Sequence, residues 1–169
     1  MQQAPVNEAI DITKLQADIN QQLAYDPDLV FIRIRTVLVA YISGMVDADR
    51  IEREITKPLT QAEPTTDSLS VHLLTPEYTH TDLFETLIDN LLAGFVIIAE
   101  QGQQQVLLAN LACLPHRNIE QPETESGVRG PREGFTELLE MNVSLLRRRL
   151  KTDKLRFKTW QIGALSQTE

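Results

Sequence analysis

GFVIIAEQGQQQVLLANLA, residues 94–112, is the stretch that decides the fold of this chain. Its two apolar runs, at 95–99 and 104–112, are separated by the polar turn Glu100-Gln101-Gly102-Gln103. Apolar runs of this length on either side of a short segment containing glycine predict a β-hairpin of buried strands. Gly94 stands where a left-handed residue ends a helix, so a helix should precede the hairpin.

The region before this hairpin predicts one helix and one short strand. Thr81 is the expected cap of a helix that reaches Gly94. Its apolar face comprises Leu83, Phe84, Leu87, Ile88, Leu91 and Leu92. Before Pro76, the apolar residues in 69–74 alternate with polar ones, which favours a short strand.

The N-terminal half begins with a loose polar arm, 1–13, and an amphipathic helix at 12–25. Residues 29–43 follow. Ile32 and Ile34 alternate with arginines, which indicates an exposed edge strand, whereas 37–42 is apolar throughout, as in a buried central strand. A tight hairpin near Arg35-Thr36 and one long bent strand both stay open, because the usual turn residues are missing.

A further helix is expected after Gly44. Asp47 is its predicted N-cap, Ile51 and Ile55 fall one turn apart, and Pro58 should end the helix or kink its last turn. Helices and strands thus interleave along the chain. The predicted fold is α/β, with a mixed sheet of about four to six strands layered with helices.

Composition narrows the function classes. The 169 residues suit one domain or slightly more, and the net charge of −8 argues against a protein that neutralises phosphate backbone. Cys113 is the only cysteine, so no intrachain disulfide forms. The first eleven residues lack Lys and Arg, and the longest apolar run, 91–99, is too short to cross a bilayer. We expect an intracellular chain that does not span a membrane.

The C-terminal part contains a long polar connector, 116–134, and a helix expected at 131–151. Gly130 can serve as its N-cap, and Pro131 suits the first helical position. Three arginines, 147–149, occupy the last turns, where cations complement the helix dipole. A last strand is expected at 155–162. The predicted organisation is an arm (1–13), an α/β subdomain (14–115), the connector (116–134) and a helix with a last strand (135–169).

Five short stretches together resemble the A-subunit family of GerA-type spore germination receptors. RNIEQPETE at 117–125 and VRGPREGFTE at 128–137 are followed by Asn142 and RRRLK at 147–151. Upstream, YISGMVD at 41–47 and GFVII at 94–98 agree in order. The string Arg-Gly-Pro-Arg-Glu-Gly-Phe-Thr-Glu is the most specific part.

The resemblance implies an N-terminal domain on the cytosolic (spore core) face of the spore inner membrane. In the family, a second α/β subdomain and transmembrane helices follow and assemble into a nutrient-responsive channel. The chain would then be a soluble first subdomain, and its helix and last strand (135–169) would either pack on this subdomain or lead to a second one. Its role would be non-catalytic: assembly with other receptor subunits, self-association in the full-length protein, and coupling of the nutrient signal to the channel.

The resemblance and the charges single out one set of motif and interaction residues. They are Arg117, Pro122, Glu123, Glu125, Arg129, Gly130, Pro131, Arg132, Glu133, Gly134, Phe135, Glu137, Asn142, Arg147 and Arg149.

Two interpretations of the glycine-rich turn stay open. It can bind an anion or a nucleotide through backbone donors at a helix N-terminus, which would make the chain a ligand-sensing regulatory domain. Alternatively it is a structural cap in which Arg129 and Arg132 pair with nearby glutamates.

The arginines of 147–149 point in three directions, so we expect a solvated helix end or an intersubunit salt bridge rather than nucleic-acid binding. Asn142 falls on the apolar stripe and should hold a neighbouring backbone group. Cys113 and His116 form half a metal site at best. The sequence predicts no enzyme, cofactor or metal.

Overall fold

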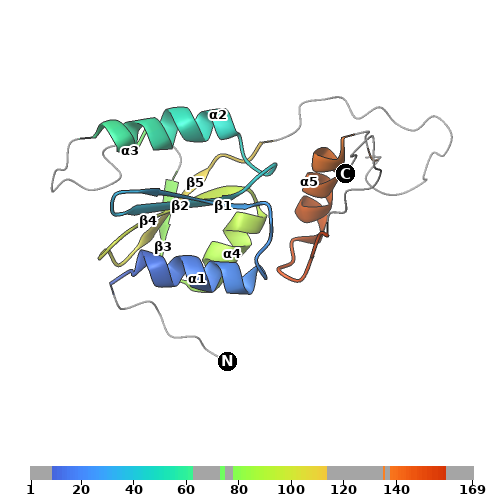
Figure 1. The fold of residues 1–169 in the computed structure, drawn as a ribbon, viewed down its shortest axis with the longest axis horizontal. Coiled ribbons are helices and arrows are strands. Elements are labelled where there is room, and N and C mark those ends of the chain that lie inside the picture. The colour runs from blue at the N-terminus through green and yellow to red at the C-terminus, as the bar shows by residue number, and fades with distance from the viewer. Residues whose placement is uncertain (1–8, 63–72, 75–77, 114–134, 136–137, 159–169) are drawn as a thin grey trace, which may run out of the picture.

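The computed structural model describes residues 9–62, 73–74, 78–113, 135 and 138–158 (Figure 1). Its centre is a five-stranded sheet with the order β1-β2-β4-β5-β3. The strands are β1 (Leu29–Ile34), β2 (Val37–Ile42), β3 (Tyr78–Thr81), β4 (Phe95–Glu100) and β5 (Val106–Asn110). All four neighbouring pairs are antiparallel, which is more uniform than the mixed sheet expected. The α/β architecture and the predicted strand number are confirmed.

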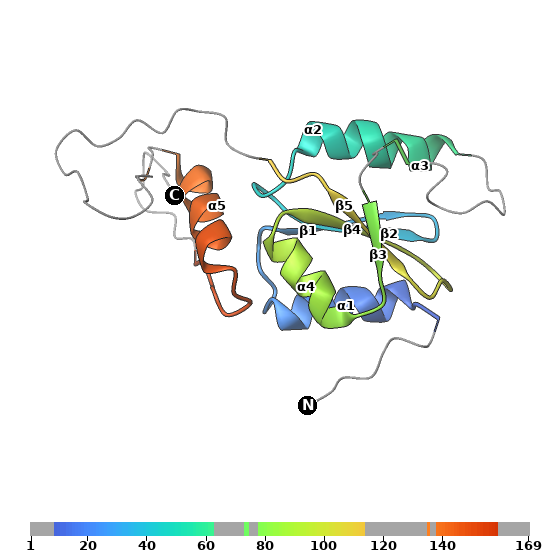
Figure 2. The same cartoon turned by 180° about the vertical axis from the view of Figure 1, so that it is seen from behind.

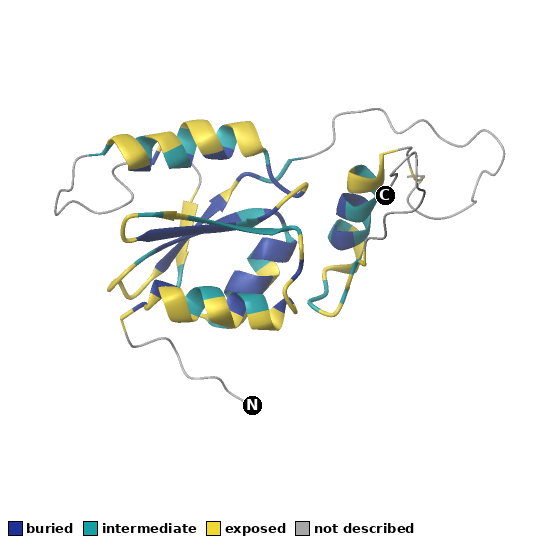
Figure 3. Cartoon of the chain, in the orientation of Figure 1, coloured by how far each residue is buried: buried dark blue, intermediate teal, exposed yellow. Residues whose placement is uncertain are grey.

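Helices cover both faces of the sheet (Figures 1 and 2). One face carries α1 (Ile12–Gln22) and α4 (Phe84–Leu92), and the other carries the continuous helix formed by α2 (Ala48–Ile51), η1 (Glu52–Thr56) and α3 (Lys57–Gln61). The central strands β2 and β4 and the inner helix faces are buried between these layers (Figure 3). The core is therefore an apolar sandwich of helix, sheet and helix.

Pro58 explains the π-helical turn η1. Proline has no amide hydrogen to donate to the carbonyl of residue i−4 and its ring clashes with that group. The carbonyl of Glu54 instead accepts a bond of 3.0 Å from the amide of Leu74. The helix widens at this point and continues to Gln61, so Pro58 does not end it.

The first strand pair is a tight hairpin, which resolves the alternative left open by the sequence. Ile34 faces Val37 across the two-residue turn Arg35-Thr36. Arg35 is left-handed, with a φ of 52°, and its guanidinium donates to the carbonyl of Ala62 at 2.6 Å. This distant contact offsets the cost of a left-handed non-glycine residue. The predicted edge position of β1 and central position of β2 are confirmed.

The β4–β5 hairpin and the role of Gly94, whose φ is 89°, are confirmed. The strand predicted at 69–74 is wrong where it can be tested: Leu73 and Leu74 lie outside any strand, and the strand in this region is β3. Leu74 cannot join the sheet because its amide bonds to Glu54. Residues 69–72 lie outside the described residues.

Two predicted boundaries also move. Thr81 ends β3, and its hydroxyl accepts from the amide of Leu83, the N-cap of α4, at 3.3 Å. At the other end, the arm predicted for 1–13 is too long. Ile10 and Ile12 are buried, and the amide of Ile10 donates to the carbonyl of Gln103 at 2.7 Å.

The C-terminal region departs most from prediction. Helix α5 is Leu139–Leu150, and Leu138 before it is extended, with φ −90° and ψ 112°. Phe135 is non-helical and 71% exposed, so the continuous helix expected from 131 is wrong. Lys151, with a φ of 39°, ends α5. Residues 152–158 then form no strand, which overturns the described part of the strand predicted at 155–162.

Candidate functional site: the α5 joint

Helix α5 lies against one end of the sheet, outside the helix layers (Figures 1 and 2). At this end β1 begins, β2 ends and β5 ends, as the pairing of Leu29 with Ile42 and of Phe95 with Asn110 requires. Three segments leaving these strand ends contact α5. We call their contacts with α5 the α5 joint: Asp26, Asp28, Gly44 and Cys113 on the sheet side, and Ser144, Arg147 and Arg148 on the helix.

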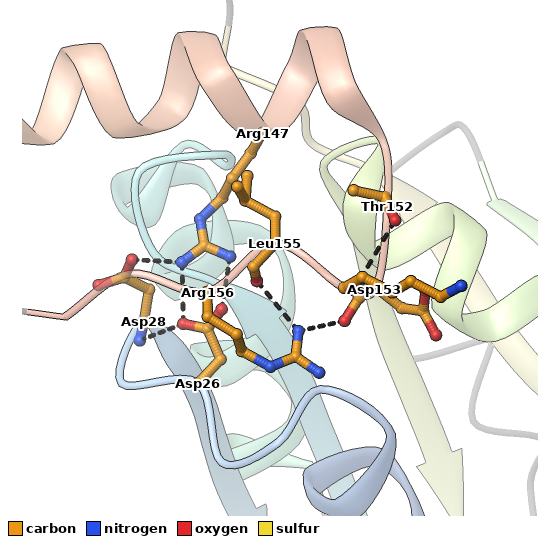
Figure 4. A network of polar contacts seen from close by, with 8 residues as sticks. Asp26, Asp28, Arg147, Thr152, Asp153, Leu155 and Arg156 are labelled. Carbon is orange, nitrogen blue, oxygen red and sulfur yellow. Dashed lines mark hydrogen bonds and ion pairs between the residues drawn. The ribbon is translucent and has the colours of Figure 1, made fainter.

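A buried arginine holds the centre of the joint (Figure 4). The Nη1 and Nη2 atoms of Arg147 donate to both carboxylate oxygens of Asp26, at 2.6 and 2.8 Å, and Nη2 also donates to Asp28 at 2.7 Å. The side chains of Arg147 and Asp26 are only 2% and 3% exposed, whereas that of Asp28 is 36% exposed. Phe157 places its ring centroid 4.7 Å from the guanidinium carbon. The cluster combines bidentate ion pairing with a cation–π contact.

The two aspartates keep the buried guanidinium of Arg147 in its charged form. Burial acts to lower the pKa of Arg147, but the hydrogen bonds and charges of Asp26 and Asp28 outweigh it and raise the pKa above its ordinary value. Arg147 therefore stays charged while buried. Removing Arg147 would leave Asp26 as an uncompensated charge in a low-dielectric site.

Ser144 forms a second contact one turn earlier on α5. Its hydroxyl lies 2.9 Å from the carbonyl oxygen of Gly44 and 2.8 Å from that of Glu140. A Cβ at Gly44 would stand 2.7 Å from the Ser144 hydroxyl, and the φ of Gly44 is 76°. Close approach and a left-handed backbone both require glycine here.

Arg148 and the turn before Asp26 complete the joint. The guanidinium of Arg148 donates to the carbonyl of Cys113, the residue that follows the bridge between Val46 and Ala112. On the other side, Ala24 and Tyr25 are both left-handed, with φ of 49° and 57°. Each such residue costs about 1 kcal/mol or more. The turn that presents Asp26 to Arg147 is thus strained.

Most of the predicted site residues lie outside the described part of the chain, and their roles stay predictions. They are Arg117, Pro122, Glu123, Glu125, Arg129, Gly130, Pro131, Arg132, Glu133, Gly134 and Glu137. The anion-binding turn is among them.

Four predicted site residues are described. Phe135 is exposed instead of lying on a buried stripe. Asn142 is half-buried, and its backbone N–H donates to the carbonyl of Leu138 at 3.2 Å, as in an ordinary helical turn. Arg149 is exposed. Arg147 corrects the sequence interpretation, because it is buried in an ion pair within the chain instead of being solvated or intersubunit.

Sequence reasoning missed Asp26, Asp28 and Ser144. The signal for the two aspartates was weak, because Asp26-Pro27-Asp28 reads locally as an ordinary turn. Across the described residues, no group of three His, Cys, Asp or Glu side chains lies close enough to hold a metal ion.

This chain belongs to the class of α/β domains in which helices cover both faces of one sheet. In addition, the helix α5 is held at the sheet end by an ion pair. Its fold matches the crystal structure of the N-terminal domain of the A subunit of the Bacillus megaterium spore germinant receptor GerK3. The TM-score is 0.68 and the sequence identity is 17%, over 96% of this chain and 64% of that one. This likeness establishes the fold.

Sequence comparison then identifies the family. Residues 17–169 match the family model described as Bacillus/Clostridium GerA spore germination protein, and the chain belongs to this family. It is 25% identical to spore germination protein KA of Bacillus subtilis, over 98% of this chain and 33% of that protein. It is 30% identical to spore germination protein XA of Bacillus anthracis, over 79% of this chain and 29% of that protein. The chain spans about a third of the length of these relatives.

The resemblance to receptor A subunits is thereby confirmed. Within the residues that the structure describes, no helix is both long enough and apolar enough to cross a membrane.

Proposed function

We propose that this chain is a non-catalytic module of a spore germination receptor A subunit that helps the subunits assemble and couples the nutrient signal to a membrane channel. It would act on the cytosolic face of the spore inner membrane. The observation that carries the proposal is the α5 joint, in which a whole helix is held at the sheet end by directional polar contacts.

The chemistry of the joint suits a coupling role. Of the three buried residues of α5, Ser144 and Arg147 are polar and only Leu145 is apolar. A helix with so little buried apolar surface gains little free energy from the hydrophobic effect. Its position depends on a few bonds, so a signal that changes the geometry at Asp26 or Gly44 would move α5 without unfolding the sheet.

The test compares two cations of the C-terminal region in the full-length receptor. Arg147→Met removes the buried cation, and Lys154→Met removes an exposed one seven residues later. We expect Arg147→Met to slow nutrient-triggered germination of spores at normal receptor level, measured by immunoblot, and Lys154→Met to leave it unchanged. Equal germination of the two strains would contradict the coupling role.

We also propose that the motif segment from Arg117 to Glu137 contributes contacts to other subunits. Arg132→Ala or Glu133→Ala should weaken subunit assembly or the germination response while the isolated domain folds nearly as before. Co-purification of subunits from spores measures assembly, and thermal unfolding of the isolated chain controls for folding. Unchanged assembly of the full-length receptor would remove the motif segment from this role.

A further inference from the structure

Strand β1 borders the sheet (Figure 1) and lacks most of the features that protect such a border. It has six residues in an uninterrupted register with β2, contains no proline, and carries one charged side chain, that of Arg33. Natural sheets protect their borders with short strands, prolines, bulges or inward-pointing charges. β1 is instead a regular, mostly apolar strand of ordinary length.

The register fixes which backbone groups of β1 point away from the sheet. Ile34 and Val37 close a two-residue turn, so they form a hydrogen-bonded pair, and alternate residues of β1 bond to β2. The amide and carbonyl groups of Phe31 and Arg33 therefore point outward. The bond from the amide of Gln101 to the carbonyl of Thr36 agrees with this pattern. It shows that the even-numbered backbone groups from Thr36 into β2 point toward β4, so the odd-numbered groups of β2 are the ones that bond to β1.

These outward groups find no partner within the described part of the chain. β2 is the sole strand that pairs with β1 there. The amide of Leu29 differs, because it donates to the carbonyl of Asp26 at 3.1 Å and closes the preceding turn. Phe31 and Arg33 thus offer two donors and two acceptors along one border.

We propose that β1 pairs antiparallel with β1 of a second copy of this chain, with Ile32 opposite Ile32 of the second copy. This deepens the assembly part of the proposed function, on which it rests, by naming the surface and the partner. In this register Phe31 faces Arg33 of the second copy, and all four outward groups of each chain are paired.

Self-complementarity is the argument for a second copy as the occupant. The neighbouring register, with Phe31 opposite Phe31, needs the amide of Leu29, which is already used. The favoured register also sets each Arg33 guanidinium beside a Phe31 ring on the same face of the sheet. No two residues of like charge face each other in this register. One border pair buries less than the roughly 1,200 Å² of a standard interface. The pair is therefore weak alone and is strengthened when other contacts hold two copies together.

A disulfide test reads both the pairing and its register. In the Cys113→Ser background, which has no other cysteine, Ile32→Cys places two thiols at a non-hydrogen-bonded pair. The Cα atoms of such a pair lie about 4.5 Å apart, within the range that a disulfide spans. Val30→Cys is the matched control, because residue 30 shares the face and the half-buried state of Ile32 but would face Ile34 of the second copy.

We expect at least about tenfold more cross-linked dimer from Ile32→Cys than from Val30→Cys under mild oxidation, because only the first pair meets disulfide geometry. Adding Arg33→Pro, which removes an outward amide and spares the β2 ladder, should abolish the cross-link. Sedimentation equilibrium of the unsubstituted chain and of Arg33→Pro gives a second measurement without cysteines. Equal cross-linking at both positions, or no association in either experiment, overturns the proposal.

The outcome is separable from that of the coupling role. If Ile32→Cys does not cross-link while Arg147→Met still slows germination, the β1 pairing fails alone. If the cross-link forms while Arg147→Met spores germinate normally, the pairing stands and coupling fails.

Discussion

Helices α4 and α5 are similar in length but are held in opposite ways. The buried residues of α4 are Leu87, Ile88, Leu91 and Leu92, whereas those of α5 are Ser144, Leu145 and Arg147. Apolar burial is non-directional and scales with area, so α4 stays in place as long as its stripe faces the sheet. α5 depends on bonds that hold only in one geometry. One domain thus combines a core held by apolar burial with a peripheral helix held by directional polar contacts.

The largest effect is expected where apolar burial dominates. Ile97 is fully buried in β4, and Ile97→Ala should lower the free energy of unfolding by about 4 kcal/mol through lost burial and a cavity. Urea unfolding measures this change. Leu139→Ala on α5, at a side chain that is 51% exposed, is the control and should change stability by about 0.5 kcal/mol or less. Similar losses of stability from both variants would contradict the difference between the core and α5.

The next effect is expected at the α5 joint, and it should be local. Arg147→Met leaves Asp26 buried without its cation, which costs about 3 kcal/mol. Because α5 buries a single apolar side chain, we expect its amides to lose hydrogen-exchange protection while those of β2 and β4 keep theirs.

A second substitution checks the cause of that loss. Adding Asp26→Asn to Arg147→Met replaces the orphaned charge by a neutral amide and should recover about 1 kcal/mol. Exchange that rises uniformly through α5, β2 and β4 would mean that the joint belongs to the core.

The contrast between apolar burial and distant polar contacts also explains which elements the sequence predicts well. The strands on either side of Gly102 and the helix ended by Gly94 follow from local periodicity and from the residues that terminate each element. The β1–β2 turn could not be decided, because the contact that stabilises Arg35 comes from Ala62, 27 residues away. Local patterns cannot include such a partner.

The α5 region was harder for the same physical reason. Gly130 and Pro131 are good local signals for a helix start, yet α5 begins at Leu139, after the extended Leu138. Arg147 reads locally as one of three cations in a last helical turn. Its partners Asp26 and Asp28 are 121 and 119 residues away, so its burial follows from tertiary structure alone.

A smaller effect is expected at Gly44, where the sheet end meets Ser144. Gly44→Ala adds a Cβ at 2.7 Å from the Ser144 hydroxyl and strains a left-handed backbone, so we expect a loss of about 2 kcal/mol in thermal or urea unfolding. Ser144→Ala in the same chain removes the close contact but leaves the backbone strain. The double variant should therefore lose less free energy of unfolding than the sum of the losses of the two single variants. Full additivity would show that the helix and the sheet end do not meet in solution.

The smallest effect concerns a surface ion pair on the core helix, where polar contacts support apolar burial instead of replacing it. Hydrogen bonds from Arg50, and then from Arg53, lower the pKa of Glu54 below its ordinary value of 4.5, although burial opposes them. A lowered pKa in the folded state means that this stabilisation is complete above the unfolded value. It is lost as the pH falls below about 4.5 through the folded pKa. Glu54→Gln should cost about 0.5 kcal/mol at pH 7 and progressively less at lower pH, measured by urea unfolding. Asp89→Asn, at an exposed site on α4, controls for the loss of a charge. A cost of Glu54→Gln that is independent of pH would assign its role to packing alone.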